Sequence, residues 1–104
     1  MKVVGFCGFS GSGKTTLVEQ LISRLRLAGQ RVSVIKHAHH DFDIDQPGKD
    51  SHRHREASAF EVLIASDRRL ARIREYERQA DPTVHQLLAE IYEVDWVLVE
   101  GFKH

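Results

Sequence analysis

A glycine-rich stretch near the N-terminus constrains this chain more than any other feature. Residues 8–15 read GFSGSGKT and match the pattern G-x-x-x-x-G-K-[ST] at every fixed position. The valine-rich run before it, residues 2–7, predicts a buried strand, and Leu17, Val18 and Leu21 begin a helical repeat after it. A chance match is possible in isolation, but strand, loop and helix in this order are typical of a phosphate-binding loop.

The chemistry of this loop follows from its residue types. Small residues let the backbone wrap tightly, so that successive N–H groups point at phosphate oxygens near the positive end of a helix dipole. We expect Lys14 to reach the β- and γ-phosphates, Thr15 to offer its hydroxyl to magnesium, and Thr16 to contact the α-phosphate. The predicted phosphate-binding residues are Gly8, Ser10, Gly11, Ser12, Gly13, Lys14, Thr15 and Thr16. The motif predicts nucleotide binding and leaves the reaction open.

The rest of the chain predicts an α/β fold. Helices are expected at 14–28, with Gly29 as a stop, at 50–58, and after Asp81 as a cap with Pro82 in the first helical position. Strands are expected at 31–37, 59–66 and 95–102, while the arginine-rich residues 67–78 predict a short strand or an irregular segment. Strands that alternate with helices indicate a mainly parallel sheet flanked by helices, the P-loop NTPase fold.

Composition narrows the class of protein. A length of 104 residues predicts a single nucleotide-binding domain, residues 1–104. With 15 basic and 15 acidic residues the chain lacks the basic surplus of a nucleic-acid-binding protein. No apolar run suggests a membrane helix, and the single cysteine, Cys7, fits a reducing cytoplasm and a structural rather than a reactive role.

A carboxylate stands where this class of protein holds magnesium. Residues 97–101, VLVEG, predict a buried strand that ends at Glu100. A carboxylate at the carboxyl end of a parallel strand faces the ligand crevice, so Thr15 and Glu100 are the predicted metal ligands. The alternative is an ordinary surface glutamate at a strand end. Asp95 opens the same strand at the opposite end of the sheet and is expected to be a turn residue.

Residues 36–51, KHAHHDFDIDQPGKDS, follow the second predicted strand and are unusually rich in histidine and aspartate. One interpretation is a segment that senses magnesium and the γ-phosphate, through Asp41, Asp43, Asp45 or Asp50. A transition-metal site is a second, because five of the seven histidines gather at 37, 39, 40, 52 and 54, although without regular ligand spacing. A solvated loop without a specific role is the third. The arginines at 68, 69, 72, 74 and 78 likewise form either a phosphate-binding face or a solvated segment balanced by Asp67, Glu75 and Glu77.

Three motifs together resemble the MobB family of molybdopterin-guanine dinucleotide biosynthesis adaptor proteins: GFSGSGKTT, VIKHAHHDFDIDQPGKDS and LVEGFKH. The resemblance implies a dimeric GTP-binding protein that assists the molybdenum cofactor guanylyltransferase, which joins GMP to molybdopterin. It implies that Gly11 to Thr16 hold the phosphates, that Thr15 and Glu100 serve Mg²⁺, and that the loop containing Asp45 and Asp50 lines the same site.

Two functions remain open from the residues. One is a GTP-binding adaptor with weak hydrolysis, and the other is a small-molecule kinase in which the arginine-rich segment closes over the phosphate. Guanine preference has no signature, because no base-reading motif of the N-K-x-D type is present. Since the family's chains continue beyond EGFKH, we expect the fold to be incomplete at the C-terminus, with apolar surface uncovered around residues 96–99 and with self-association.

Overall fold

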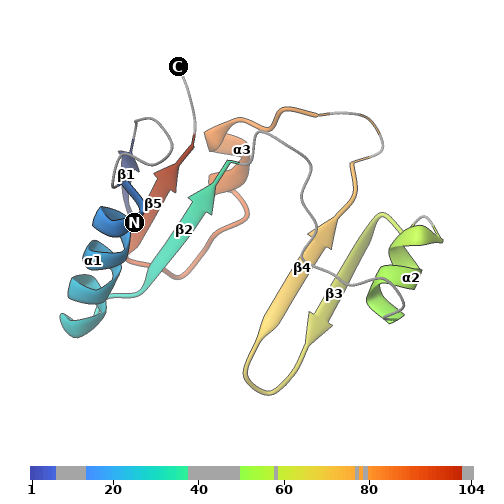
Figure 1. Cartoon of the computed structure of the whole chain (residues 1–104), viewed down its shortest axis with the longest axis horizontal. Helices are drawn as coiled ribbons and strands as arrows, with labels where there is room; N and C mark the ends of the chain where they lie inside the picture. Colours follow the sequence, from blue (N-terminus) through green and yellow to red (C-terminus); the bar gives the residue numbers. More distant parts are fainter. Residues whose placement is uncertain (7–13, 38–49, 58, 77, 79, 102–104) are drawn as a thin grey trace. The chain divides into compact units, whose positions relative to one another are not determined.

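The computed structural model describes residues 1–6, 14–37, 50–57, 59–76, 78 and 80–101 (Figure 1). The chain separates into two compact units. The first comprises Met1–Asp41 and Pro82–His104, and the second comprises Phe42–Asp81. Each unit is described by itself. No helix in these described ranges is long and apolar enough to cross a bilayer.

The first unit is built on a parallel sheet of three strands. β1 (Lys2–Phe6), β2 (Val32–Lys36) and β5 (Trp96–Glu100) lie in the order β1-β5-β2. β5 is the central strand, and its continuous apolar run suits a strand covered on both faces. Val97 and Leu98 are fully buried and Val99 is 5% exposed, so the predicted uncovered apolar surface around residues 96–99 is wrong for these three residues. The expected α/β architecture with a parallel sheet is therefore confirmed, and each of these three strands falls within its predicted range.

Helices flank this sheet, as Figure 1 shows for α1 (Lys14–Leu27) and α3 (Val84–Leu88). Successive strand residues point to opposite faces. Val97, Val99 and Ile35 share one face, and the partly buried side chains that pack against them include three from α3 (Val84, Leu87 and Leu88). Leu98 points to the opposite face. α1 lies beside β2 on that side and buries Val18.

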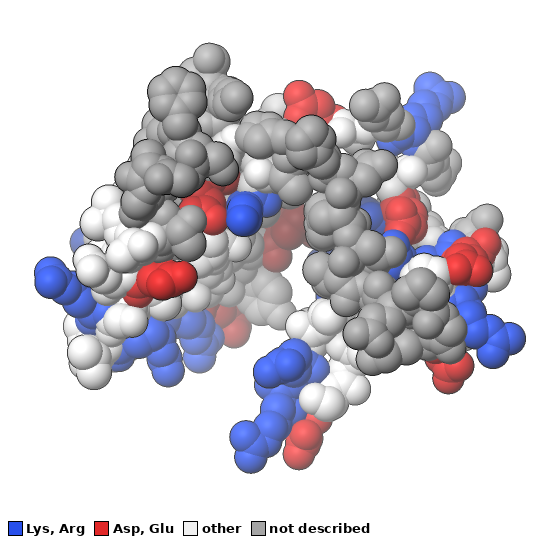
Figure 2. All heavy atoms as spheres, viewed as in Figure 1, with Lys and Arg blue, Asp and Glu red and all other residues white. Residues whose placement is uncertain are grey.

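α1 ends where the sequence predicts. The Gly29 backbone has φ +78°, a left-handed conformation that glycine adopts without a Cβ penalty. Gln30 N donates to Leu25 O at 2.9 Å and Gly29 N donates to Arg26 O at 3.0 Å, the hydrogen-bond pattern of a Schellman cap. Figure 2 shows Lys and Arg side chains near this end, where Arg24 complements the negative end of the helix dipole.

Hydrogen bonds join the turns at the amino ends of the three strands. Arg31 N donates to the Asp95 carboxylate at 2.8 Å, and Lys2 N donates to Asp95 O at 2.9 Å. Asp95 therefore organises the turn before β5, as expected. The Lys2 ammonium also lies 5.1 Å from the centroid of the Trp96 ring.

The start of α3 differs from the prediction. Thr83, and not Asp81, is the N-cap: its hydroxyl accepts from Gln86 N at 3.1 Å, while Thr83 N donates to the Gln86 side chain at 2.8 Å. This reciprocal capping box satisfies two donors at once, an arrangement that Asp81 lacks because Val84 stands three residues after it. Pro82 consequently precedes the helix. The helix is also shorter than expected, and Ile91 lies beyond its end.

The second unit contains α2 (Asp50–Glu56), β3 (Glu61–Ala65) and β4 (Leu70–Arg74). The third predicted strand does not join the parallel sheet but pairs with β4 as an antiparallel hairpin. The turn explains this. Ser66 N donates to Arg69 O at 2.9 Å, and the Ser66 hydroxyl accepts from Arg68 N at 3.2 Å. So short a connection suits a hairpin, whereas parallel strands need a crossover of a dozen residues or more.

Candidate functional site

The carboxyl ends of β1, β5 and β2 meet at one edge of the sheet. Phe6, Glu100 and Lys36 stand at corresponding positions in the two parallel pairings. The amino end of α1 lies at this edge too, because α1 leads through the short turn after Leu27 to the start of β2 at the opposite edge. Its 14 residues span about 21 Å, a little more than a five-residue strand. This edge is where an open parallel sheet presents its ligand site.

Glu100 is the one buried charged residue in the described core. Its exposed fraction is 8%, and Oε2 has no hydrogen-bond partner among the described residues. An ordinary surface glutamate would be solvated, so that alternative is wrong. Burying a carboxylate oxygen without a partner costs free energy, and such groups pair with cations or coordinate metals. The predicted position of Glu100 at the end of a buried strand is confirmed.

The backbone beside Glu100 is held by a close approach of two strand ends. His37 N donates to Glu100 O at 3.0 Å, which extends the β2–β5 ladder by one residue. Gly101 follows with φ +88°, and a Cβ built there would lie 2.6 Å from His37 O. Glycine is therefore required at position 101 both for its conformation and for space. The sequence VEG contains this signal, although the predicted strand, residues 95–102, ran through Gly101.

Several predicted site residues fall outside the described residues. These are Gly8, Ser10, Gly11, Ser12, Gly13 and Asp45. For Lys14 and Thr15 the structure describes the backbone, as the first two residues of α1, and Thr16 follows them as an exposed residue. Asp50 is the exposed first residue of α2, in the second unit. The proposed ligand roles of these residues stay predictions.

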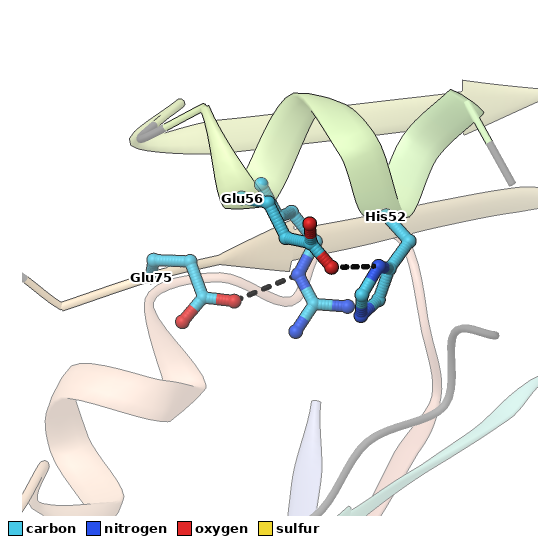
Figure 3. Close-up of polar contacts among 4 residues, drawn as sticks. His52, Glu56 and Glu75 are labelled. Carbon is cyan, nitrogen blue, oxygen red and sulfur yellow. Dashed lines mark hydrogen bonds and ion pairs between the residues drawn. The ribbon is translucent and has the colours of Figure 1, made fainter. Parts of the chain in front are cut away.

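The histidine cluster receives only a partial description, because His39 and His40 lie outside the described residues. His37 follows β2, whereas His52 and His54 lie on α2 in the other unit. Within the described ranges no group of three or more His, Cys, Asp or Glu side chains is arranged to hold a metal ion. His52 Nδ1 instead lies 2.8 Å from the Glu56 carboxylate, one helical turn along α2 (Figure 3).

The arginine-rich segment forms the hairpin turn and β4. Arg72 and Arg74 lie 3.3 Å and 3.1 Å from the Glu61 carboxylate across the hairpin. The Arg55 guanidinium of α2 lies 2.7 Å from the carboxylate of Glu75, just after β4 (Figure 3). These arginines balance acidic partners within the hairpin unit. Glu61 was missed as a partner because only the antiparallel register brings it opposite Arg74.

Comparison with known proteins decides the family. MobB, described as molybdopterin guanine dinucleotide synthesis protein B, matches residues 3–104. The chain belongs to the MobB family. The resemblance carried by the three motifs is thereby confirmed.

Relatives and solved structures agree with this assignment. The chain is 41% identical to the molybdopterin-guanine dinucleotide biosynthesis adapter protein of Escherichia coli over 98% of its length, and 46% identical to that of Haemophilus influenzae over 97%. It spans 59% and 57% of those two proteins. The crystal structure of Bacillus subtilis MobB superposes with a TM-score of 0.75 at 29% identity, covering 98% of this chain and 61% of that one. The crystal structure of the MobB homologue from Bacillus stearothermophilus superposes with a TM-score of 0.63 at 27% identity. The match covers 98% of this chain and 55% of that one.

Proposed function

We propose that this chain is the nucleotide-binding part of a GTP-dependent adaptor in the synthesis of molybdopterin guanine dinucleotide. Family membership supports the pathway, because two relatives named as adapters of that biosynthesis match nearly the whole chain. The single structural observation that carries nucleotide binding is Glu100. Its Oε2 atom is buried without a hydrogen-bond partner among the described residues at the carboxyl edge of a parallel sheet, which supports a role as a ligand of a bound cation.

The residues proposed for this site have the chemistry that a magnesium nucleotide needs. Residues 8–13 and the start of α1 supply backbone N–H groups to the phosphates, Lys14 supplies a positive charge, and Thr15 supplies a hydroxyl to the metal. Glu100 supplies the carboxylate. Mg²⁺, when bound, neutralises phosphate charge and fixes the geometry of the triphosphate. Asp45 and Asp50 remain proposed contacts of the same ligand.

A magnesium titration tests this proposal. Glu100→Gln keeps the shape of the side chain and removes its charge. We expect GTP binding in the presence of Mg²⁺ to weaken, while binding measured with EDTA changes little. Isothermal titration calorimetry measures both. If the magnesium dependence of the variant overlays that of the wild type, Glu100 does not serve the metal.

The adaptor role needs a partner, and we propose the guanylyltransferase that attaches GMP to molybdopterin. The word adapter in the names of the relatives supports a role beside another enzyme. We place the activity in the cytoplasm, in keeping with the single cysteine. Purified transferase, molybdopterin and labelled GTP, mixed with and without this protein, test the role. Faster dinucleotide formation supports it, whereas direct transfer of the γ-phosphate to a small molecule would support the kinase alternative.

We further propose a homodimer formed through the hairpin. Leu63 and Leu70, which share one face near its turn, expose 51% and 61% of their surface, and Ile64 on the other face exposes 41%. A two-stranded hairpin is marginal in water, and contiguous exposed apolar side chains mark interaction surfaces. In sedimentation velocity runs, Leu70→Lys should shift the protein towards monomer. Leu27→Lys, at the 90% exposed end of α1, is the matched control and should leave the distribution unchanged. A monomeric wild type would refute the dimer.

A further inference from the structure

A lysine stands beside Glu100 on the same face of the sheet. Lys36 is the register partner of Glu100 in the β2–β5 pairing, so both side chains point to the same side. Neighbouring strands lie about 4.8 Å apart. The two residues are therefore neighbours at the carboxyl edge, where the amino end of α1 also lies.

These two opposite charges do not pair with each other. No ion pair or hydrogen bond joins Lys36 to Glu100, and the Lys36 side chain has no such partner elsewhere in the described parts of the chain. Lys36 is exposed, whereas Glu100 is 8% exposed with Oε2 unpartnered. Neighbouring residues of opposite charge that form no ion pair suit a ligand with a positive and a negative part. A metal ion satisfies the carboxylate, and a phosphate bound to that metal satisfies the ammonium.

The strand order indicates which phosphate Lys36 meets. β1, which precedes the phosphate loop, lies on one side of β5, and β2 lies on the other. Lys36 is thus two strand spacings, roughly 10 Å, from the strand that leads into the loop. The proposed phosphate-binding loop follows β1, and Glu100 on β5 lies between β1 and Lys36 in the strand order. The Lys36 ammonium group, on the other side of Glu100, is therefore suited to contact the end of the phosphate chain that extends beyond the metal ion.

We infer that Lys36 is a second phosphate-binding cation of this site and that it recognises the terminal phosphate of a nucleoside triphosphate. The inference rests on the proposed nucleotide-binding function and adds how the site distinguishes a triphosphate from a diphosphate. Lysine suits the role because its flexible four-carbon stem carries a compact charge to a phosphate oxygen. The backbone hydrogen bond from His37 N to Glu100 O, 3.0 Å long, holds the two strand ends in this register.

Calorimetric titration with Mg²⁺ and either a non-hydrolysable GTP analogue or GDP tests the inference. Lys36→Met should lower affinity for the analogue by about tenfold, the effect of one charge-assisted contact at an exposed position. Affinity for GDP should fall by less than about threefold, and Lys36→Arg should retain most of the binding to the analogue. Because Lys36 is exposed, the variants should fold, and circular dichroism checks this.

Lys2→Met is the matched control. Lys2 lies on the same sheet face at the amino edge, in register with Trp96, so the variant makes the same change in net charge away from the site. Equal losses for the analogue and GDP, no loss for either, or the same loss in Lys2→Met would each overturn the inference. If the wild type binds neither nucleotide, the proposed function fails and the inference fails with it. Wild-type binding with an unaffected Lys36→Met overturns the inference alone.

Discussion

Replacing Gly101 with alanine should destabilise the first unit through two separate effects. The backbone of Gly101 has φ +88°, which costs a residue with a Cβ about 1–2 kcal/mol. The new methyl group would also lie 2.6 Å from His37 O, well inside van der Waals contact with a backbone atom. The strand ends must separate to relieve this contact. Separation weakens the His37 N to Glu100 O hydrogen bond, worth about 0.5–1.5 kcal/mol.

These contributions sum to about 1.5–3.5 kcal/mol of lost stability for Gly101→Ala. For a domain of this size, 1 kcal/mol lowers the melting temperature by about 4–8 °C, so a drop of roughly 6–28 °C is expected. Differential scanning calorimetry or thermal circular dichroism measures it. Displacement of Glu100 should also weaken the magnesium dependence of GTP binding.

Two other glycines provide matched controls. Gly29 has φ +78° but no atom within 4 Å of a built Cβ, so Gly29→Ala tests the backbone strain alone. Gly5 has open space and no positive φ, and Gly5→Ala should change stability by less than about 0.5 kcal/mol. The loss of stability for Gly101→Ala should exceed that for Gly29→Ala by about 0.5–1.5 kcal/mol, the steric part. Equal melting temperatures for these two variants would refute the close approach of Gly101 to His37.

Other variants test separate features of the chain. Thr83→Ala removes the capping box of α3 and should cost about 1 kcal/mol, measured by urea unfolding, whereas Thr83→Ser should cost little. Glu61→Gln removes the charge of the carboxylate that Arg72 and Arg74 share. The free energy of unfolding should fall by less than about 1 kcal/mol, and by less still at high salt. Lys14→Ala should lower GTP affinity by about ten- to a hundredfold without unfolding the protein. Phosphate release by the isolated protein should stay below about 1 per second, and faster turnover would contradict an adaptor with weak hydrolysis.

Much of the first unit could be predicted because its patterns are local. The valine-rich runs of β1 and β5 read as buried strands, and Gly29 marked the end of α1. The position of Glu100 followed from a general rule about the carboxyl ends of parallel strands. Its burial did not follow, because the exposed fraction depends on what the neighbouring strands and helices cover.

The hairpin could not be predicted because strand pairing is not a local property. The apolar run of β3 suits a parallel or an antiparallel partner equally well, and its connection to β4 contains no Asn-Gly or Asp-Gly pair. A serine side chain closes the turn instead. The cap of α3 was predictable in principle. Thr83 is followed three residues later by Gln86, the pattern of a capping box, whereas Asp81 is followed at that spacing by Val84.

The burial of Glu100 connects the stability of the fold to its proposed function. A buried acceptor without a partner costs about 1–3 kcal/mol, and more when it is charged. That is a large fraction of the stability of a small domain. A leucine at this position would continue the apolar run of β5 on the face of Leu98 and avoid the cost. The fold carries a carboxylate there, beside a lysine that forms no ion pair with it and before a glycine whose replacement would strain the backbone. Such a costly arrangement is expected at a binding site and supports the proposed ligand at this edge of the sheet.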